Sequence, residues 1–305
     1  MTATIQRVAV VGSGRMAPGI ASACMIAGAD VVIAARDLDK AAAAARSALD
    51  AVAGARAAGG VEPSGIEPGA FDGVDVTIET IAEDLRLKAG VYERIEPWLP
   101  PTAVLATNTS SFPITALAER LQRPGRFAGF HFLNPAHATA VVEVVPGVRT
   151  EAETSERLGD LARRMGKLPL TLRRDVPGFI WNRLQYAVLR ECLHLLEEGV
   201  ASIESIDAAV SDGLAPRWLG AGPFATADLG GLATFAAVAD QLLPQLSRTT
   251  STPATMTERA TGARGFYIWD DEREQAVAEL RAQGLAAAEE WIQRRRAAMP
   301  PADEP

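Results

Sequence analysis

Short apolar runs alternate with amphipathic stretches along the first half of the chain. The run Arg7–Val11 stops at Gly12, and such a run is typical of a strand buried on both faces of a parallel sheet. Residues 16–27 then have helical character, and residues 30–34 form a second buried strand pattern. Because strand and helix alternate in this way, we predict a doubly wound α/β domain with a parallel sheet.

The same reading predicts further elements up to residue 173. Strands are expected at 74–77, 103–107, 126–132, 141–145 and 169–173, and helices at 38–58, 85–99, 114–121 and 155–165. The stretch 59–73 is rich in glycine, proline and glutamate, and is predicted to be a loop.

The pattern changes near residue 176. Beyond it, helical periodicity dominates, with a long amphipathic helix expected at 184–199, where Gly199 ends it, and another at 202–211. We therefore predict an α/β domain over residues 1–176 and an all-α domain over residues 177–305.

Composition restricts the classes of protein that the chain can belong to. Of its 305 residues, 48% are hydrophobic and 22% charged, which is typical of a globular protein, and the net charge of −8 argues against nucleic-acid binding. Cys24 and Cys192 lie far apart without a CxxC motif, so we expect free thiols and no metal. The sequence has neither a signal-peptide pattern nor an apolar run long enough to span a membrane. We expect a cytoplasmic protein.

A glycine turn joins the first strand to the first helix. The sequence Gly12-Ser13-Gly14-Arg15-Met16-Ala17 is a GxGxxA variant of the dinucleotide fingerprint. Gly12 permits the tight turn, Gly14 lets the backbone approach a pyrophosphate, and Ala17 allows close helix packing. Its place between a buried strand and a helix favours a Rossmann-type nucleotide site, with Arg15 and Met16 beside the phosphates, over a glycine-rich turn without a ligand.

The end of the second strand bears on the choice of cofactor. An NAD site usually places an acid there for the ribose 2′-hydroxyl, but this chain has Ala35 followed by Arg36 and Asp37. Arg36 is suited to a 2′-phosphate, and Ala17 points the same way. NADP is therefore favoured over NAD, although Asp37 keeps NAD open.

Four polar residues suit the oxidation of an alcohol. His131 is a candidate general base, because histidine exchanges protons near neutral pH, and Glu143 is a candidate partner if adjacent strands bring the two together. Ser110 and Asn182 are candidates for contacts with the substrate oxygen. Taken singly, the histidine can be structural and Ser110 or Asn182 a helix cap. A buried Glu143 without a partner is costly, which favours the functional reading.

The chain resembles the 3-hydroxyacyl-CoA dehydrogenases over nearly its whole length. The shared features are the glycine turn, IETIAEDL at 78–85 with Lys88, NTSS at 108–111, HFLNP at 131–135, VEVVP at 142–146, PGFIWNR at 177–183, GPF at 222–224 and GFYIW at 265–269. The resemblance implies a His131–Glu143 dyad, with Ser110 and Asn182 at the substrate. It also implies that the helical domain forms a homodimer. Further site residues that it implies are Glu83, Lys88 and Asn108 at the cofactor, and Asn134 at the substrate.

The chain departs from this family in ways that bear on its substrate. Acyl-CoA enzymes of the family carry a long helical hairpin after the second strand, and residues 37–74 are too few for it. The segment 213–218 is more similar to the lambda-crystallin and L-gulonate 3-dehydrogenase branch and to carnitine dehydrogenases, which act on free hydroxy acids. Arg217 in that segment is a candidate for binding a substrate carboxylate, or equally a surface arginine.

We therefore expect a dehydrogenase that interconverts 3-hydroxy and 3-keto groups on an acyl thioester, as in fatty acid metabolism, with NAD or NADP. The alternatives are a dehydrogenase of a free 3-hydroxy acid, a non-catalytic nucleotide-binding protein and an NADP-sensing regulator.

Overall fold

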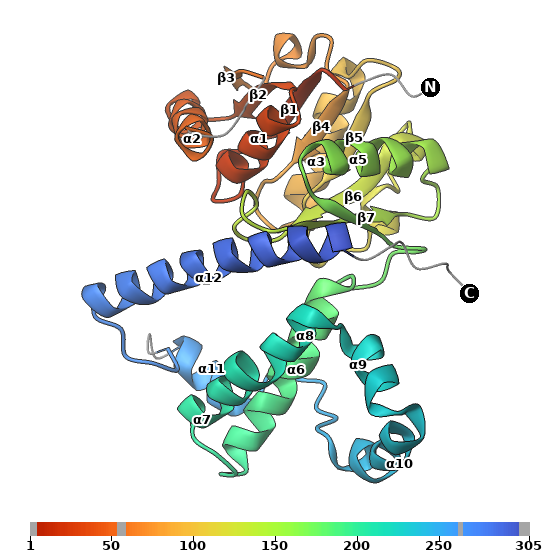
Figure 1. The fold of residues 1–305 in the computed structure, drawn as a ribbon. Helices are drawn as coiled ribbons and strands as arrows, with labels where there is room; N and C mark the ends of the chain where they lie inside the picture. The colour runs from red at the N-terminus through yellow and green to blue at the C-terminus, as the bar shows by residue number, and fades with distance from the viewer. Residues whose placement is uncertain (1–4, 54–58, 262–264, 299–305) are drawn as a thin grey trace. The chain divides into compact units, whose positions relative to one another are not determined.

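The computed structural model describes residues 5–53, 59–261 and 265–298. The chain divides into two compact units, Met1–Arg183 and Leu184–Pro305, which we call the α/β unit and the helical unit (Figure 1). The division follows the segment 177–183, so this segment, placed at the start of the second domain by the sequence prediction, is part of the α/β unit.

An eight-stranded sheet forms the centre of the α/β unit, in the order β3-β2-β1-β4-β5-β6-β7-β8. The strands are β1 (Arg7–Val11), β2 (Asp30–Ala35), β3 (Val61–Gly65), β4 (Val76–Glu79), β5 (Val104–Thr107), β6 (Phe127–Phe132), β7 (Val141–Pro146) and β8 (Leu168–Thr171). The predicted doubly wound sheet is confirmed with one difference. Neighbours pair in parallel except β6 and β7, which are antiparallel, so β7 and β8 run against the other strands.

Helices cover both faces of this sheet because its strands are apolar on both faces. In β1, Val8 and Val10 pack into a core shared with α1, α2 and α5, whereas Ala9 and Val11 pack into a second core with α3 and α4. These helices are α1 (Ala17–Ile26), α2 (Leu38–Ala51), α3 (Leu85–Ile95), α4 (Ile114–Leu117) and α5 (Ala152–Arg164), with short 3-10 turns at Pro68–Phe71, Glu96–Trp98 and Pro124–Arg126. The arrangement brings the carboxyl ends of β1, β2, β4, β5 and β6 to one edge.

The loop predicted at 59–73 is wrong. Within it, Val61–Gly65 forms β3, which pairs in parallel with β2, and Pro68–Phe71 forms a 3-10 turn. Pro63 and Gly65 give the stretch the composition of a loop, but β3 lies at the edge of the sheet, where a strand tolerates proline. The helix predicted at 38–58 ends at Ala51 in the structure, and its last predicted residues, 54–58, lie outside the described residues.

The helical unit contains the expected α-helices. They are α6 (Trp181–Glu197, which begins in the preceding segment), α7 (Ile203–Ala208), α8 (Ala215–Gly220), α9 (Pro223–Gly230), α10 (Leu232–Leu242), α11 (Ala254–Thr261) and α12 (Asp271–Ala298), with a π-helical segment at Ala209–Leu214 and a 3-10 turn at Leu243–Gln245. Among the residues that the structure describes in this unit, Leu193 and Ile206 are the only buried hydrophobic residues. The unit therefore has almost no core of its own.

Candidate active site

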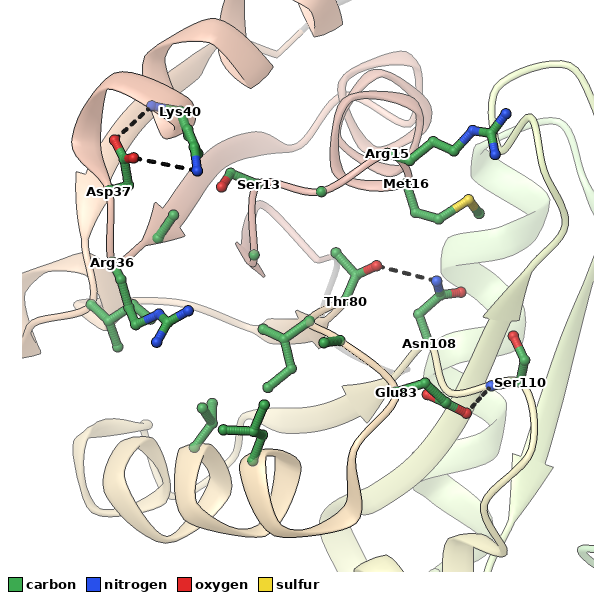
Figure 2. A pocket seen from close by; sticks show the side chains of 18 residues that line it. Ser13, Arg15, Met16, Arg36, Asp37, Lys40, Thr80, Glu83, Asn108 and Ser110 are labelled. Carbon is green, nitrogen blue, oxygen red and sulfur yellow. Dashed lines mark hydrogen bonds and ion pairs between the residues drawn. The ribbon is translucent and has the colours of Figure 1, made fainter. Parts of the chain in front are cut away.

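A cavity of about 720 Å³ opens at the carboxyl ends of the strands and is lined by the glycine turn (Figure 2). Gly12 has φ +127°, and a Cβ there would lie 2.7 Å from the Thr80 carbonyl oxygen, so only glycine fits. A Cβ at Gly14 would meet nothing within 4 Å, which leaves room for a ligand to approach the backbone. Both features, together with the start of α1, fit a nicotinamide dinucleotide with its pyrophosphate over the glycine turn.

The wall of the cavity at the end of β2 combines two cations with one acid. Asp37 caps α2, since its Oδ1 accepts the Lys40 backbone N–H at 3.1 Å, and its Oδ2 lies 3.7 Å from the Lys40 Nζ. Arg36 is exposed and lines the cavity with Lys40 (Figure 2). The predicted candidates Arg15, Met16, Glu83, Asn108 and Ser110 also line this cavity.

His131 and Glu143 lie directly opposite each other in the antiparallel pair β6–β7. The Glu143 Oε2 is 2.7 Å from the His131 Nδ1, and the side chain of Ser110 extends the series, with its Oγ 3.1 Å from the His131 Nε2. His131 is 3% exposed and Glu143 fully buried, whereas Ser110 is exposed. The structure therefore brings these three predicted side chains together, in an order that can move a proton from an alcohol oxygen to an imidazole held by a carboxylate.

The segment before α6 holds the other oxygen of Glu143. The backbone N–H groups of Ile180 and Trp181 donate to the Glu143 Oε1 at 2.8 and 2.9 Å. Gly178 and Phe179 precede them with φ +77° and +51°, and the buried Phe179 ring packs edge-on against His131 at 5.5 Å between centroids. Glu143 therefore lies at the N-terminus of a helix, where a negative charge is favoured.

Asn182 completes this group from the first turn of α6. Its Nδ2 donates to the Ser110 carbonyl oxygen at 3.0 Å, so it fixes the backbone of the loop that carries Ser110. Asn134 is exposed on the loop after β6, and Arg217 is exposed on α8 in the helical unit. The roles predicted for Asn134 and Arg217 stay predictions.

Sequence reasoning missed Glu79, which is fully buried at the end of β4. Five hydrogen bonds reach its carboxylate: one from the Ile81 N–H, two from the Lys88 Nζ, one from the Tyr92 hydroxyl and one from the Thr107 hydroxyl. Burial and the neighbouring Glu79 raise the pKa of Tyr92 well above its usual value, so its hydroxyl remains a donor. The only signal for this site in the sequence is an acid that ends an apolar run.

Glu83 joins this acid to the candidate site. Its Oε2 lies 3.4 Å from the Lys88 Nζ, and its Oε1 accepts from the loop at Thr109–Ser111. Burial alone raises the pKa of Glu83, but hydrogen bonds from Thr109 and Ser111 and the charge of Lys88 outweigh it and lower the pKa below its usual value. Glu79, Lys88 and Glu83 therefore form one connected group of charged side chains.

No group of three or more metal-binding side chains occurs in the part of the chain that the structure describes. Burial raises the pKa of Cys24 to about 12, and burial also raises the pKa of Cys192, which favours the neutral thiol form of both side chains. Nor is any described helix both long and apolar enough to span a membrane.

The fold and this site are those of an oxidoreductase with a nicotinamide cofactor, and the comparisons with known proteins agree. Residues 7–176 match the 3-hydroxyacyl-CoA dehydrogenase NAD binding domain, and residues 178–266 match the C-terminal domain of the same enzymes. The chain belongs to the 3-hydroxyacyl-CoA dehydrogenase family.

Relatives within this family act on different kinds of substrate. The chain is 31% identical to 5-formyl-3-hydroxy-2-methylpyridine 4-carboxylate 5-dehydrogenase of Mesorhizobium japonicum, over 95% of this chain and 99% of the relative. It is 34% identical to L-carnitine dehydrogenase of Streptomyces griseus, over 86% of this chain and 80% of that enzyme. It is also 34% identical to a probable 3-hydroxybutyryl-CoA dehydrogenase of Bacillus subtilis, over 65% of this chain and 70% of the relative.

Solved structures differ in how much of the fold they share with this chain. A 5-formyl-3-hydroxy-2-methylpyridine 4-carboxylic acid 5-dehydrogenase, described as an NAD+ dependent dismutase, has a TM-score of 0.89 at 30% identity, covering 95% of this chain and 99% of that chain. The (S)-3-hydroxybutyryl-CoA dehydrogenase of Ralstonia eutropha has a TM-score of 0.68 at 30% identity, covering 88% of this chain and 100% of that chain. At equal identity, the pyridine carboxylate enzyme is more similar in structure.

Proposed function

We propose that this protein is a nicotinamide-dependent dehydrogenase of a small carboxylic acid that carries no CoA. The observation that carries the proposal lies between β2 and β3, where α2 is the only helix among the described residues and the hairpin expected of CoA enzymes does not fit. The higher TM-score to the pyridine carboxylate enzyme and the match to a carnitine dehydrogenase support the same substrate class. An acyl thioester is the second candidate, supported by the family and its 3-hydroxybutyryl-CoA relatives.

The proposed chemistry uses the side chains at the end of β6. A substrate hydroxyl placed beside Ser110 gives its proton to the His131 Nε2, and Glu143 stabilises the imidazolium that forms. When bound, the nicotinamide supplies the hydride acceptor. Asn182 and Glu83 hold the loop that carries Ser110, so that the hydroxyl group stays aligned with the imidazole.

The relatives and the residues at the end of β2 favour different nicotinamide cofactors. The match to an NAD binding domain and the NAD+ dependent relative favour NAD, which we propose as the cofactor. The preference for NADP expected from the sequence rests on Arg36, Ala17 and the missing acid at position 35, and the comparisons do not support it. Asp37 is already engaged by α2, which leaves Arg36 and Lys40 as the described cations lining this part of the cavity.

We also propose that the helical unit pairs with a second copy of the chain. Phe224, Leu229 and Ile268 are 88%, 83% and 85% exposed, and the described part of the unit buries almost no apolar side chains of its own. A surface of this kind is typical of a protein interface. Light scattering coupled to gel filtration should give twice the mass of the chain, whereas a monomer at micromolar concentration contradicts the pairing.

The decisive experiment for the function measures initial rates with NAD and NADP, each with a free hydroxy acid and with the matching 3-hydroxyacyl-CoA. Turnover of free acids alone supports the proposal and makes Arg217 the first candidate for binding the carboxylate. Turnover of the thioester alone refutes it in favour of the second candidate. His131→Ala is the control, since unchanged turnover in that variant contradicts the assigned proton acceptor.

A further inference from the structure

The side chain of Asn108 links the ends of two strands that do not pair with each other. Its Oδ1 accepts the Phe132 backbone N–H at 2.8 Å, and its Nδ2 donates to the Thr80 hydroxyl oxygen at 3.2 Å, a bond drawn in Figure 2. Because a backbone N–H can only donate, the first bond fixes which end of the amide is the oxygen and turns the NH₂ group towards Thr80. Asn108 follows β5, which lies between β4 and β6 in the sheet, so it reaches both neighbouring strands.

The end of β6 lacks a strand partner on the edge that faces β5. The pairing of β5 with β6 stops at Thr107 and Gly129, so the last three residues of β6 pair with β7 but not with β5. The Asn108 amide takes the place of the missing β5 backbone at Phe132, the residue after His131. This bond therefore restrains the backbone next to His131 on the edge that β7 does not reach.

Thr80, at the other end of the link, lies against the glycine turn. Its backbone N–H donates to the Val11 carbonyl oxygen at 2.8 Å, and its own carbonyl oxygen would lie 2.7 Å from a Cβ at Gly12. Thr80 and Asn108 both line the candidate cofactor cavity. A continuous series of contacts thus runs from the glycine turn through these two side chains to the strand that carries His131.

We propose that Asn108, held by Thr80, is a positioning residue that fixes the proton acceptor His131 relative to the dinucleotide site. The inference rests on the proposed function, in which His131 accepts the substrate proton. The hydride and the proton leave the same alcohol group, so both acceptors must be correctly placed, and a displacement of about 1 Å can cost about 10²-fold in rate. A carboxamide has two N–H groups and two acceptor lone pairs, so this role is compatible with the contact between Asn108 and the cofactor that the family resemblance implies.

The main test is Thr80→Val, which replaces the hydroxyl by a methyl group of similar size and leaves Asn108 in place. The amide should then hold Phe132 less firmly, and hydrogen exchange of the Phe132 backbone N–H should accelerate at least about threefold, as expected when a hydrogen bond of ordinary strength is weakened. The single-turnover rate should fall at least about fivefold, because a reacting group is displaced. The Kd for the cofactor, measured by fluorescence quenching, should stay the same. Thr80→Ser keeps the hydroxyl, so it should show the exchange and the rate of the unmodified protein.

Thr77→Val is the matched control. Thr77 is a fully buried threonine on β4, and its hydroxyl has no hydrogen-bond partner among the residues that the structure describes. Its replacement by valine makes the same change of atoms close to Thr80, so the exchange at Phe132, the rate and the cofactor Kd should all stay normal. Equal effects of Thr77→Val and Thr80→Val would show a general response to changes near β4 and would overturn the proposal.

A double-mutant cycle with His131→Ala separates the positioning of His131 from other effects. If the link acts through His131, adding Thr80→Val to His131→Ala should lower the rate no further. Fully additive losses overturn the proposal, as does a Thr80→Ser variant that is as slow as Thr80→Val.

Hydrogen exchange requires no substrate, so it distinguishes failure of this inference from failure of the proposed function. Normal exchange at Phe132 in Thr80→Val, together with lost turnover in His131→Ala, contradicts the positioning role alone. Accelerated exchange at Phe132, together with normal turnover in His131→Ala, shows that the link exists but contradicts the proposed function, and the positioning role of Asn108 in catalysis is then overturned with it.

Discussion

Replacing Glu143 by glutamine should disable proton transfer while leaving the fold and the cofactor site intact. The two oxygens of Glu143 have different partners: Oε1 accepts from the amides of Ile180 and Trp181, and Oε2 pairs with the His131 Nδ1. Glutamine has one oxygen and one NH₂ group, so only one of these sets can keep its acceptor. The orientation that the amide adopts decides the outcome.

The amide oxygen is expected to remain on the two backbone donors. Turning it towards His131 would leave both buried N–H groups facing an NH₂ group, at a cost of about 1–3 kcal/mol for each. With the oxygen on the backbone, the NH₂ group donates to the His131 Nδ1, which forces the imidazole proton onto Nε2, the atom that faces Ser110. His131 can then no longer accept the substrate proton. General base catalysis contributes about 10²–10⁴-fold, so kcat should fall by about that factor, or about 2.7–5.4 kcal/mol.

The assay is single-turnover reduction of the cofactor, followed at 340 nm with the best substrate of the rate panel, together with the Kd for the cofactor. Glu156→Gln, an exposed charge removal on α5, is the matched control and should behave as the unmodified protein. A Glu143→Gln rate within about threefold of normal would refute the argument, because the expected loss begins at about 10².

Three further predictions follow from the walls of the cavity. If Arg36 contacts a 2′-phosphate, Arg36→Ala should make the binding free energy of NADP less favourable by about 2–3 kcal/mol and leave that of NAD unchanged. Equal losses of affinity for both cofactors would contradict that contact. Gly12→Ala should lower Tm, because the added Cβ would lie 2.7 Å from the Thr80 carbonyl oxygen and the backbone there has φ +127°. Gly14→Ala should keep the normal Tm and lose cofactor affinity in calorimetric titration, because a Cβ there meets no protein atom within 4 Å. A normal Tm for Gly12→Ala would refute the steric argument. Burial raises the pKa of Glu83, but its hydrogen bonds and Lys88 lower it overall below 4.5, so its stabilising contribution is present above that pH and lost as the pH falls through the lower folded value. The Tm difference between the unmodified protein and Glu83→Gln should therefore shrink on acidification, and a difference that grows would contradict the direction of this shift.

The sequence predicted the parts of the site that lie on regular strands. His131 and Glu143 each interrupt a buried apolar run, and a polar residue in such a run needs a partner on a neighbouring strand, which the antiparallel pairing of β6 and β7 provides. Glu79 escaped notice because its partners come from helix α3 and from the next strand, and no spacing in the sequence links them. Strand β3 was missed because its hydrogen bonds to β2 form at a sheet edge, where the residue types resemble those of a loop.

The contact between Glu143 and the amides of Ile180 and Trp181 limits how this protein can be divided. A fragment that stops at residue 176 retains all the described residues that line the cavity, but lacks both donors to the Glu143 Oε1. Such a fragment should still take up the dinucleotide and yet be unable to turn over substrate. Exchange of the helical unit between relatives, by recombination or by design, therefore has to join the two chains after residue 183, because Ile180 and Trp181 complete the proton-accepting pair from the end of the α/β unit.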